Sequence, residues 1–172
     1  MLWAFSKDFG SSGFRLGTLY SQNAQFMAAM ANINIFTGVS NPVQALATDV
    51  MNNKDGWVDT FLDESRTRLR RSYQICTTML DGLGIPYVEA QAGLFMYIDL
   101  SSLLPEKTFE EEAKLCDLVA DKAKIVLTPG ESQRENRPGM FRICYAWVSV
   151  EVLQIAMDRL GKVLKSVQDE RA

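Results

Sequence analysis

A long helical repeat in the middle of the sequence constrains the fold of this 172-residue chain more than any other feature. Apolar residues recur three and four positions apart from Trp57 to Leu83, and this spacing predicts one continuous helix. The polar stretch at 52–56 precedes the helix. Gly84 and Pro86 follow it, and glycine readily ends a helix while proline does not continue one. The helix therefore divides the sequence into a part before it and a part after it.

Short strands and further helices are expected on both sides of this long helix. Before it, the apolar pattern predicts a buried strand at 1–6, a second strand at 14–20, and helices at 24–30 and 42–50. Asn23 is expected to cap the first of these helices. After the long helix, the pattern predicts strands at 92–100, 125–127 and 141–146, and helices at 105–123 and 148–167.

The two later helices are amphipathic, which predicts the faces that they turn toward the core. In 105–123 the inward residues are expected to be Phe109, Ala113, Leu115, Cys116 and Val119. In 148–167 they are expected to be Val152, Ala156, Leu160 and either Val163 or Leu164. The acidic run at 110–112 is assigned to the early turns of its helix, where negative charge is favourable.

Composition and charge narrow the classes of function. The net charge is −3, and the sequence has no basic stripe, so we expect no nucleic-acid partner. No apolar run is long enough to cross a membrane, and no signal peptide is expected. Cys76, Cys116 and Cys144 are odd in number and far apart, which argues against a disulfide framework and a metal site. A reducing, cytoplasmic setting is therefore expected.

The segment 5–17 gathers residues with useful chemistry. The amine of Lys7 can hold a carbonyl cofactor as a Schiff base and can carry a proton, which matters in a chain without histidine. Arg15 offers a planar guanidinium that suits phosphate, and Ser6 adds a hydroxyl donor. Three glycines permit positive φ and close backbone approach: Gly10, Gly13 and Gly17.

Ser-Lys-Asp-Phe-Gly followed by Gly-Phe-Arg-Leu-Gly resembles the cofactor-lysine motif of fold-type-I enzymes that use pyridoxal 5'-phosphate (PLP). It looks most like 1-aminocyclopropane-1-carboxylate (ACC) synthase and the class I/II aminotransferases. The resemblance implies that Lys7 is the Schiff-base lysine and that Ser6 and Arg15 bind the phosphate. Ser40 and Gln44 match residues that approach the neighbouring subunit's phosphate, although serine and glutamine are also ordinary capping residues at a helix start.

Arg142 is the second candidate site residue. An arginine within the apolar strand 141–146 is costly unless it is paired. A position on an edge strand or an internal glutamate would explain it, and so would a substrate carboxylate. In the family that the chain resembles, the matching arginine grips the α-carboxylate of the amino acid, and the preceding turn at 128–130 also matches.

The resemblance further implies a fold and a division into domains. The fold class is α/β, as the carboxy-terminal part of the aspartate aminotransferase-like fold. Residues 1–55 would be a remnant of the large PLP-binding domain, 56–84 the linking helix and 85–172 the small domain. The family holds the PLP ring nitrogen with an aspartate well before the lysine, and only six residues precede Lys7 here. Ala4 replaces a common serine, so weaker cofactor binding is expected.

Two functions are therefore considered. The first is a portion of a PLP-dependent enzyme that acts on an α-amino acid, by ACC synthase-like elimination with ring closure or by transamination. Both reactions use the same lysine and arginine, so the motifs do not separate them. The second is a catalytically inactive truncated homologue that serves as a binding or dimerisation module. Because part of a sheet exposes apolar edges, we expect a homo-oligomer or a complex with an amino-terminal portion.

Overall fold

The chain divides into two compact units, Met1–Ser65 and Arg66–Ala172, in a computed structural model that describes residues 1–171. The boundary between them falls within helix α4, Trp57–Gly82. The long helix predicted from the sequence is thus confirmed, almost to the residue. Gly84 follows it with a φ of +64°, the left-handed conformation that glycine adopts without strain.

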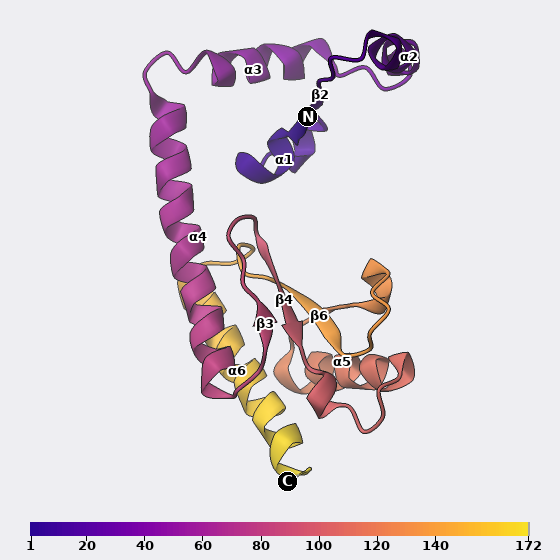
Figure 1. Ribbon diagram of the computed structural model, residues 1–172. Coiled ribbons are helices and arrows are strands. Elements are labelled where there is room, and N and C mark those ends of the chain that lie inside the picture. The colour runs from indigo at the N-terminus through magenta and orange to yellow at the C-terminus, as the bar shows by residue number, and fades with distance from the viewer. Residues whose placement is uncertain (172) are drawn as a thin grey trace. The chain divides into compact units, whose positions relative to one another are not determined.

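The first unit combines a strand pair with three helices (Figure 1). Its elements are β1 (Leu2–Ala4), α1 (Phe5–Asp8), the 3-10 turn η1 (Ser12–Phe14), β2 (Gly17–Leu19), α2 (Ala24–Asn34), α3 (Asn41–Asn52) and the first turns of α4. Strands β1 and β2 pair antiparallel, with Trp3 opposite Thr18. The predicted cap of α2 is confirmed, since the side chain of Asn23 accepts a hydrogen bond from the Phe26 amide at 3.0 Å.

The predicted buried strand at 1–6 is wrong in two respects. The strand ends at Ala4, and Phe5 begins the short helix that carries Lys7. Met1 is also 77% exposed and Leu2 is 80% exposed. The reason is that β1 pairs with β2 in a two-stranded sheet, and two strands alone cannot bury both faces.

The second unit is built on a four-stranded antiparallel sheet (Figure 1). Its strands are β3 (Tyr87–Val88), β4 (Phe95–Asp99), β5 (Thr128–Pro129) and β6 (Met140–Cys144), in the order β3-β4-β6-β5. Helices α5 (Phe109–Ala123) and α6 (Val150–Asp169) and the 3-10 turns η2 (Ser101–Leu103) and η3 (Glu131–Gln133) complete it. The Thr108 side chain caps α5 and the Ser149 side chain caps α6.

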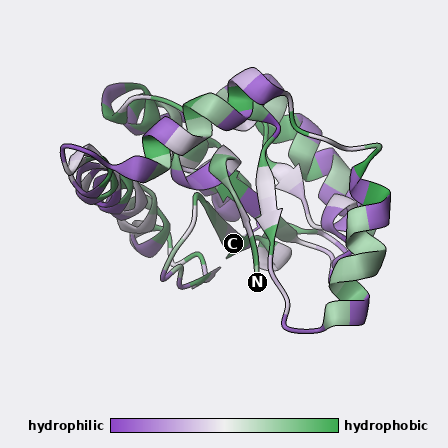
Figure 2. Ribbon diagram, turned by 90° about the horizontal axis from the view of Figure 1, so that it is seen from above, coloured by the Kyte–Doolittle hydropathy of each residue, from purple (hydrophilic) through white to green (hydrophobic). Residues whose placement is uncertain are grey.

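The core of the second unit lies between one face of the sheet and its helices. Alternate strand residues are buried, including Met96 and Ile98 on β4 and Phe141 and Ile143 on β6. Helices α4, α5 and α6 contribute the remaining core side chains, and Figure 2 shows hydrophilic and hydrophobic residues mixed along the helices, as amphipathic packing requires. The core therefore leaves the other face of β4 and β6 for a site.

Three expectations about this unit are wrong. The strand predicted at 125–127 lies instead at Thr128–Pro129, and Val126 is 87% exposed. On α6, Val152 is half exposed, and the buried residues are Leu153, Met157, Leu160, Leu164 and Val167. On α5, Ala113 is exposed and Glu112 is buried, because Glu112 shares the helix face of Leu115 and Val119.

Among residues 1–171, no helix is both long enough and apolar enough to span a bilayer.

Candidate functional site

The turn that carries Lys7 is anchored by aromatic packing. Phe5 is 2% exposed, and its ring lies 4.7 Å from the Trp3 ring and 5.3 Å from the Phe9 ring, centroid to centroid. The Phe5 carbonyl also accepts the Phe9 amide at 3.2 Å and the Ser11 amide at 3.3 Å. Lys7 is exposed on this anchored turn. The backbone thus holds Lys7 on a fixed support, with its side chain exposed.

Ser12 links Ser6, on this turn, to Arg15 by hydrogen bonds. The Ser12 hydroxyl donates to the Ser6 carbonyl at 3.4 Å, and the Arg15 Nη1 atom donates to the Ser12 carbonyl at 3.1 Å. Arg15 itself is left-handed, with a φ of 49° and a ψ of 36°, an uncommon conformation for a residue with a side chain. The structure therefore places Ser6 and Arg15, two of the three predicted phosphate ligands, on the same short segment.

The glycines of this loop meet the expectations in part. Gly10 is left-handed as predicted, with a φ of +62°. The second left-handed residue is Arg15, rather than Gly13 or Gly17. Gly17 instead permits a close backbone approach, because a Cβ atom there would lie 3.2 Å from the Trp3 carbonyl oxygen across the β1–β2 pair.

Ser40 lies at the amino-terminal cap of α3, and its side chain makes no capping hydrogen bond. Gln44 turns back instead, and its Nε2 atom donates to the Val39 carbonyl at 2.7 Å. The ordinary role of a serine at a helix start is therefore not used at this position. The exposed Ser40 hydroxyl sits at a helix end that favours negative charge.

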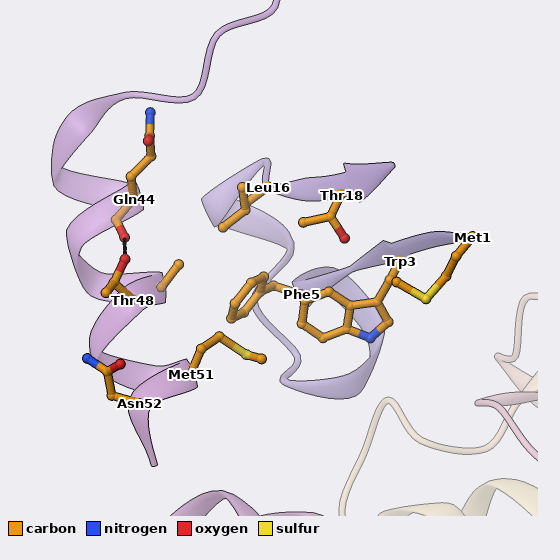
Figure 3. A pocket seen from close by; sticks show the side chains of 10 residues that line it. Met1, Trp3, Phe5, Leu16, Thr18, Gln44, Thr48, Met51 and Asn52 are labelled. Carbon is orange, nitrogen blue, oxygen red and sulfur yellow. Dashed lines mark hydrogen bonds between the residues drawn. The ribbon is translucent and has the colours of Figure 1, made fainter. Parts of the chain in front are cut away.

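The first unit also contains an apolar hollow of about 620 Å³ (Figure 3). It lies between α3 and the β1–β2 pair, where the side chains of Trp3, Phe5 and Met51 point toward one another. No lysine, arginine or carboxylate lines it. The hollow is chemically unsuited to a phosphate, and the predicted ligands Lys7 and Arg15 lie outside its lining.

Arg142 lies on β6, between β4 and β5 in the sheet. Its register partners are Tyr97 on one side and Thr128 on the other, so the three side chains share the face that turns away from the core. The Arg142 Nη1 atom donates to Gln133 Oε1 at 2.8 Å, and the guanidinium lies 4.5 Å from the centroid of the Phe95 ring. Within residues 1–171, the arginine is thus neither on an edge strand nor paired with a glutamate.

The segment 131–139, which contains η3 and the loop before β6, is held by a buried carboxylate. Glu112 is 1% exposed, and it accepts the Glu131 amide at 3.1 Å and the Gly139 amide at 2.6 Å. Gly139 has a φ of +99°, and a Cβ atom there would lie 2.4 Å from Ser101 Cα. Both ends of the loop are therefore tied to α5 before β6 carries Arg142 into the sheet.

Sequence reasoning missed three residues of this arrangement: Phe95, Glu112 and Gln133. Gln133 was part of a polar loop with no pattern, and Phe95 was part of a strand with no assigned partner. Only Glu112 had a usable signal, because it lies three and seven positions before Leu115 and Val119.

Tyr97 adds a neutral hydroxyl to the face of the sheet that carries Arg142 and Thr128. Burial is the main factor that raises the pKa of its phenol, the carboxylates of Glu135 and Glu112 raise it further, and the Arg142 charge opposes them. Tyr97 therefore stays protonated next to Arg142 at neutral pH. A hydroxyl and a guanidinium on one face form a donor surface that favours an anion.

Comparison with known proteins supplies the family. The family model described as "Aminotransferase class I and II" matches residues 2–160. The chain belongs to this family. It is 33% identical over 170 residues to 1-aminocyclopropane-1-carboxylate synthase 6 from Arabidopsis thaliana, and the match covers 99% of this chain and 34% of that protein. The chain therefore spans about a third of the length of this curated relative.

Solved structures show the same fold. The aromatic aminotransferase from Pyrococcus horikoshii superimposes with a TM-score of 0.80 at 24% identity, over 97% of this chain and 43% of that one. A PLP-bound putative aminotransferase from Clostridium difficile matches with a TM-score of 0.68 at 19% identity, over 95% and 41%. The predicted fold class, part of an α/β aspartate aminotransferase-like fold, is confirmed.

The residues present fit PLP in kind. Class I and II aminotransferases and their ACC synthase relatives are PLP-dependent. The loop at 6–15 offers an accessible amine, serine hydroxyls and a guanidinium, which are the donors that an aldehyde and a phosphate require. Asp8, the residue after Lys7, is not directed to such a ligand in this structure. Its carboxylate accepts a hydrogen bond from the Trp3 indole.

Proposed function

We propose that the chain forms a portion of a PLP-dependent enzyme that acts on an α-amino acid. Lys7 would hold the cofactor, and Ser6, Arg15 and Ser40 would bind its phosphate. Arg142 would bind the substrate's α-carboxylate. Residues 1–55 would then belong to the large domain, 56–84 to the linking helix and 85–172 to the small domain.

The observation that carries this proposal is the environment of Arg142. Arg142 lies in the middle of a sheet, and its described partners are an amide oxygen and an aromatic ring, neither of which is charged. A carboxylate would give the guanidinium the two parallel, charge-assisted hydrogen bonds that its shape allows. Family membership supports an amino acid as the source of that carboxylate.

PLP, when bound, supplies an electron sink that weakens bonds at the substrate's α-carbon. The residues of this chain would then contribute proton transfer and substrate binding. The Lys7 amine, on its anchored turn, can accept and return a proton. Arg142 would hold the carboxylate end of the substrate and so limit its orientations. Elimination with ring closure and transamination are the two candidate outcomes. The protein would work as a homodimer or with an amino-terminal portion, since Ser40 is expected to serve a neighbouring subunit's phosphate.

Trapping the cofactor tests this proposal. The purified chain is mixed with PLP, its visible spectrum is recorded, and borohydride fixes any bond to an amine before peptide mapping by mass spectrometry. We expect the label on Lys7 and its loss in Lys7→Arg, which keeps the charge and removes the reactive primary amine. Lys54→Arg is the matched control, because Lys54 is also an exposed lysine of the first unit. Label spread over all lysines would contradict the role of Lys7 and would support a non-catalytic module.

A further inference from the structure

We propose that Gln133 is the neutral, displaceable partner that holds the Arg142 guanidinium ready for an anionic ligand, and that Glu112 is the positioning residue that fixes the loop carrying Gln133. This inference rests on the proposed function, because it concerns how the carboxylate-binding arginine is held when no ligand is present.

The first step of the argument is the strength of the two kinds of contact. The amide oxygen of Gln133 accepts one hydrogen bond from Arg142, at 2.8 Å, and carries no net charge. A carboxylate accepts two, and charge-assisted hydrogen bonds are about twice as strong as neutral ones. Gln133 is exposed, so it can swing into solvent when a carboxylate arrives. The Phe95 ring, 4.5 Å from Arg142, keeps the guanidinium plane in place meanwhile.

The second step concerns the glutamates around this loop, which do not neutralise Arg142. Glu135 Oε1 accepts the Asn136 amide at 3.0 Å and the Arg137 amide at 3.2 Å, and the Arg137 Nε atom lies 3.5 Å away. Glu112 is likewise occupied by the two backbone amides of the loop. Both carboxylates are thus directed to other donors. The charge of Arg142 remains available to a ligand that arrives from outside.

The third step links Glu112 to Gln133. The amide of Glu131, which Glu112 holds, begins the 3-10 turn that ends at Gln133. A carboxylate accepts only, so it satisfies both N–H groups, of which the Gly139 amide is buried and the Glu131 amide is partly buried. Glutamine at position 112 would accept one of them and present its own NH2 group to the other, leaving donors face to face. At a site that is 1% exposed, no water replaces the lost acceptor. Glu112→Gln should therefore release η3 and misplace Gln133.

Titration of the full chain with maleate, a simple dicarboxylate, tests the role of Gln133. Binding is followed by NMR shifts of the 15N-labelled protein, and Arg142→Ala is included to show that the shifts depend on the arginine. We expect Gln133→Glu to raise the Kd for maleate about ten-fold or more, because the new carboxylate pairs with Arg142. Gln133→Ala should change it by less than about three-fold. Asn136→Asp adds the same charge to the same loop away from Arg142 and serves as the control.

A double-mutant cycle tests the role of Glu112. Glu112→Gln should change the Kd for maleate in the wild-type background by no more than Gln133→Ala does, and should have little further effect in Gln133→Ala, because the two residues act in series. A purely structural role for Glu112 would give the same loss in both backgrounds. Glu111→Gln is the matched control, since Glu111 is the next residue and pairs with Lys114 at the surface. Glu112→Asp, which keeps the charge, replaces Glu112→Gln if that variant does not fold.

The outcomes separate the two proposals. If wild-type protein shows no Arg142-dependent shift up to about 100 mM maleate, far above the millimolar range of weak sites, the carboxylate role of Arg142 is overturned. If Arg142→Ala abolishes the shifts while Gln133→Glu stays within about two-fold of wild type, the proposed function stands and Gln133 is not the displaceable partner. Equal losses in both arms of the cycle would remove Glu112 from the argument.

Discussion

The two units of the chain bury their apolar side chains to very different extents. In Met1–Ser65 the buried apolar side chains are Phe5 and Ala47, while Leu2, Ile35 and Phe36 are each at least 80% exposed. From Arg66 onward, a continuous core joins the sheet to α4, α5 and α6. Burial of apolar surface is the main favourable term in folding. The second unit therefore has the apolar core that folding by itself requires, whereas the first unit buries few apolar side chains.

Hydrogen exchange on the intact chain should show this difference most strongly. Core amides of a domain exchange only by unfolding, and a domain of this size has a free energy of unfolding of about 5–15 kcal/mol. We expect β4 and β6 to be protected by about 10³-fold or more relative to β1 and β2, because exchange slows about ten-fold per 1.4 kcal/mol. The measurement is exchange followed by mass spectrometry. Equal protection in both units would break the comparison.

Removal of one buried ring in each unit sharpens the comparison. Phe141 is fully buried in the second unit, so Phe141→Ala should lower that unit's free energy of unfolding by about 3–5 kcal/mol. Phe5→Ala should leave the same transition within about 0.5 kcal/mol, because Phe5 belongs to the other unit. Urea unfolding followed by circular dichroism measures both. A large shift caused by Phe5→Ala would mean that the units unfold together.

Two glycines offer a comparison at the level of the backbone. At Gly139, a Cβ atom meets Ser101 and the φ is +99°, so Gly139→Ala should cost about 3 kcal/mol. At Gly13, a Cβ atom meets nothing within 4 Å, so Gly13→Ala should change stability by less than about 1 kcal/mol. The midpoints of thermal unfolding rank the two variants. The prediction fails if Gly139→Ala melts within a degree or two of wild type.

The smallest expected effect concerns the cysteines. Burial raises the pKa of the Cys76 thiol from its ordinary 9.0 to about 12, and the neighbouring Cys144 adds to the shift. A raised folded-state pKa gives stability that is complete below pH 9.0 and is lost as the pH rises toward about 12. At pH 8, a thiol reagent should modify the exposed Cys144 at once and reach Cys76 only on unfolding. Rapid modification of Cys76 in the native protein would contradict the packing of this core.

Hydrophobic periodicity and sequence motifs predicted the long helix and the family. The long helix follows from spacing alone, since a run of apolar residues at helical intervals has one good conformation. The Lys7 loop and Arg142 follow from residue types whose chemistry is specific, and the comparisons bear out the family that they indicated. The helix and the family motif are local features of the chain, so they can be recognised in the sequence, while the roles of Lys7 and Arg142 stay predictions.

Tertiary partners could not be predicted in this way. The contact between Arg142 and Gln133 depends on a 3-10 turn whose position is fixed by Glu112 from another helix. The helix phase that buries Glu112 in place of Ala113 depends on how α5 rests on the sheet. The prediction of a buried strand at 1–6 was wrong because apolar composition shows only which residues could be buried. Burial also requires a second surface to pack against, and the sequence does not show whether one is present.

The left-handed backbone at Arg15 has a consequence for how this loop could change over generations. Glycine and asparagine are the residues that adopt a φ near 49° at least cost. Selection for folding alone would therefore favour those two residues at position 15, while selection for the proposed phosphate binding would favour arginine despite its strained backbone. The residue found at this position in related proteins thus indicates which of the two requirements has been stronger. A change to glycine would indicate that the fold has been retained without the proposed phosphate contact.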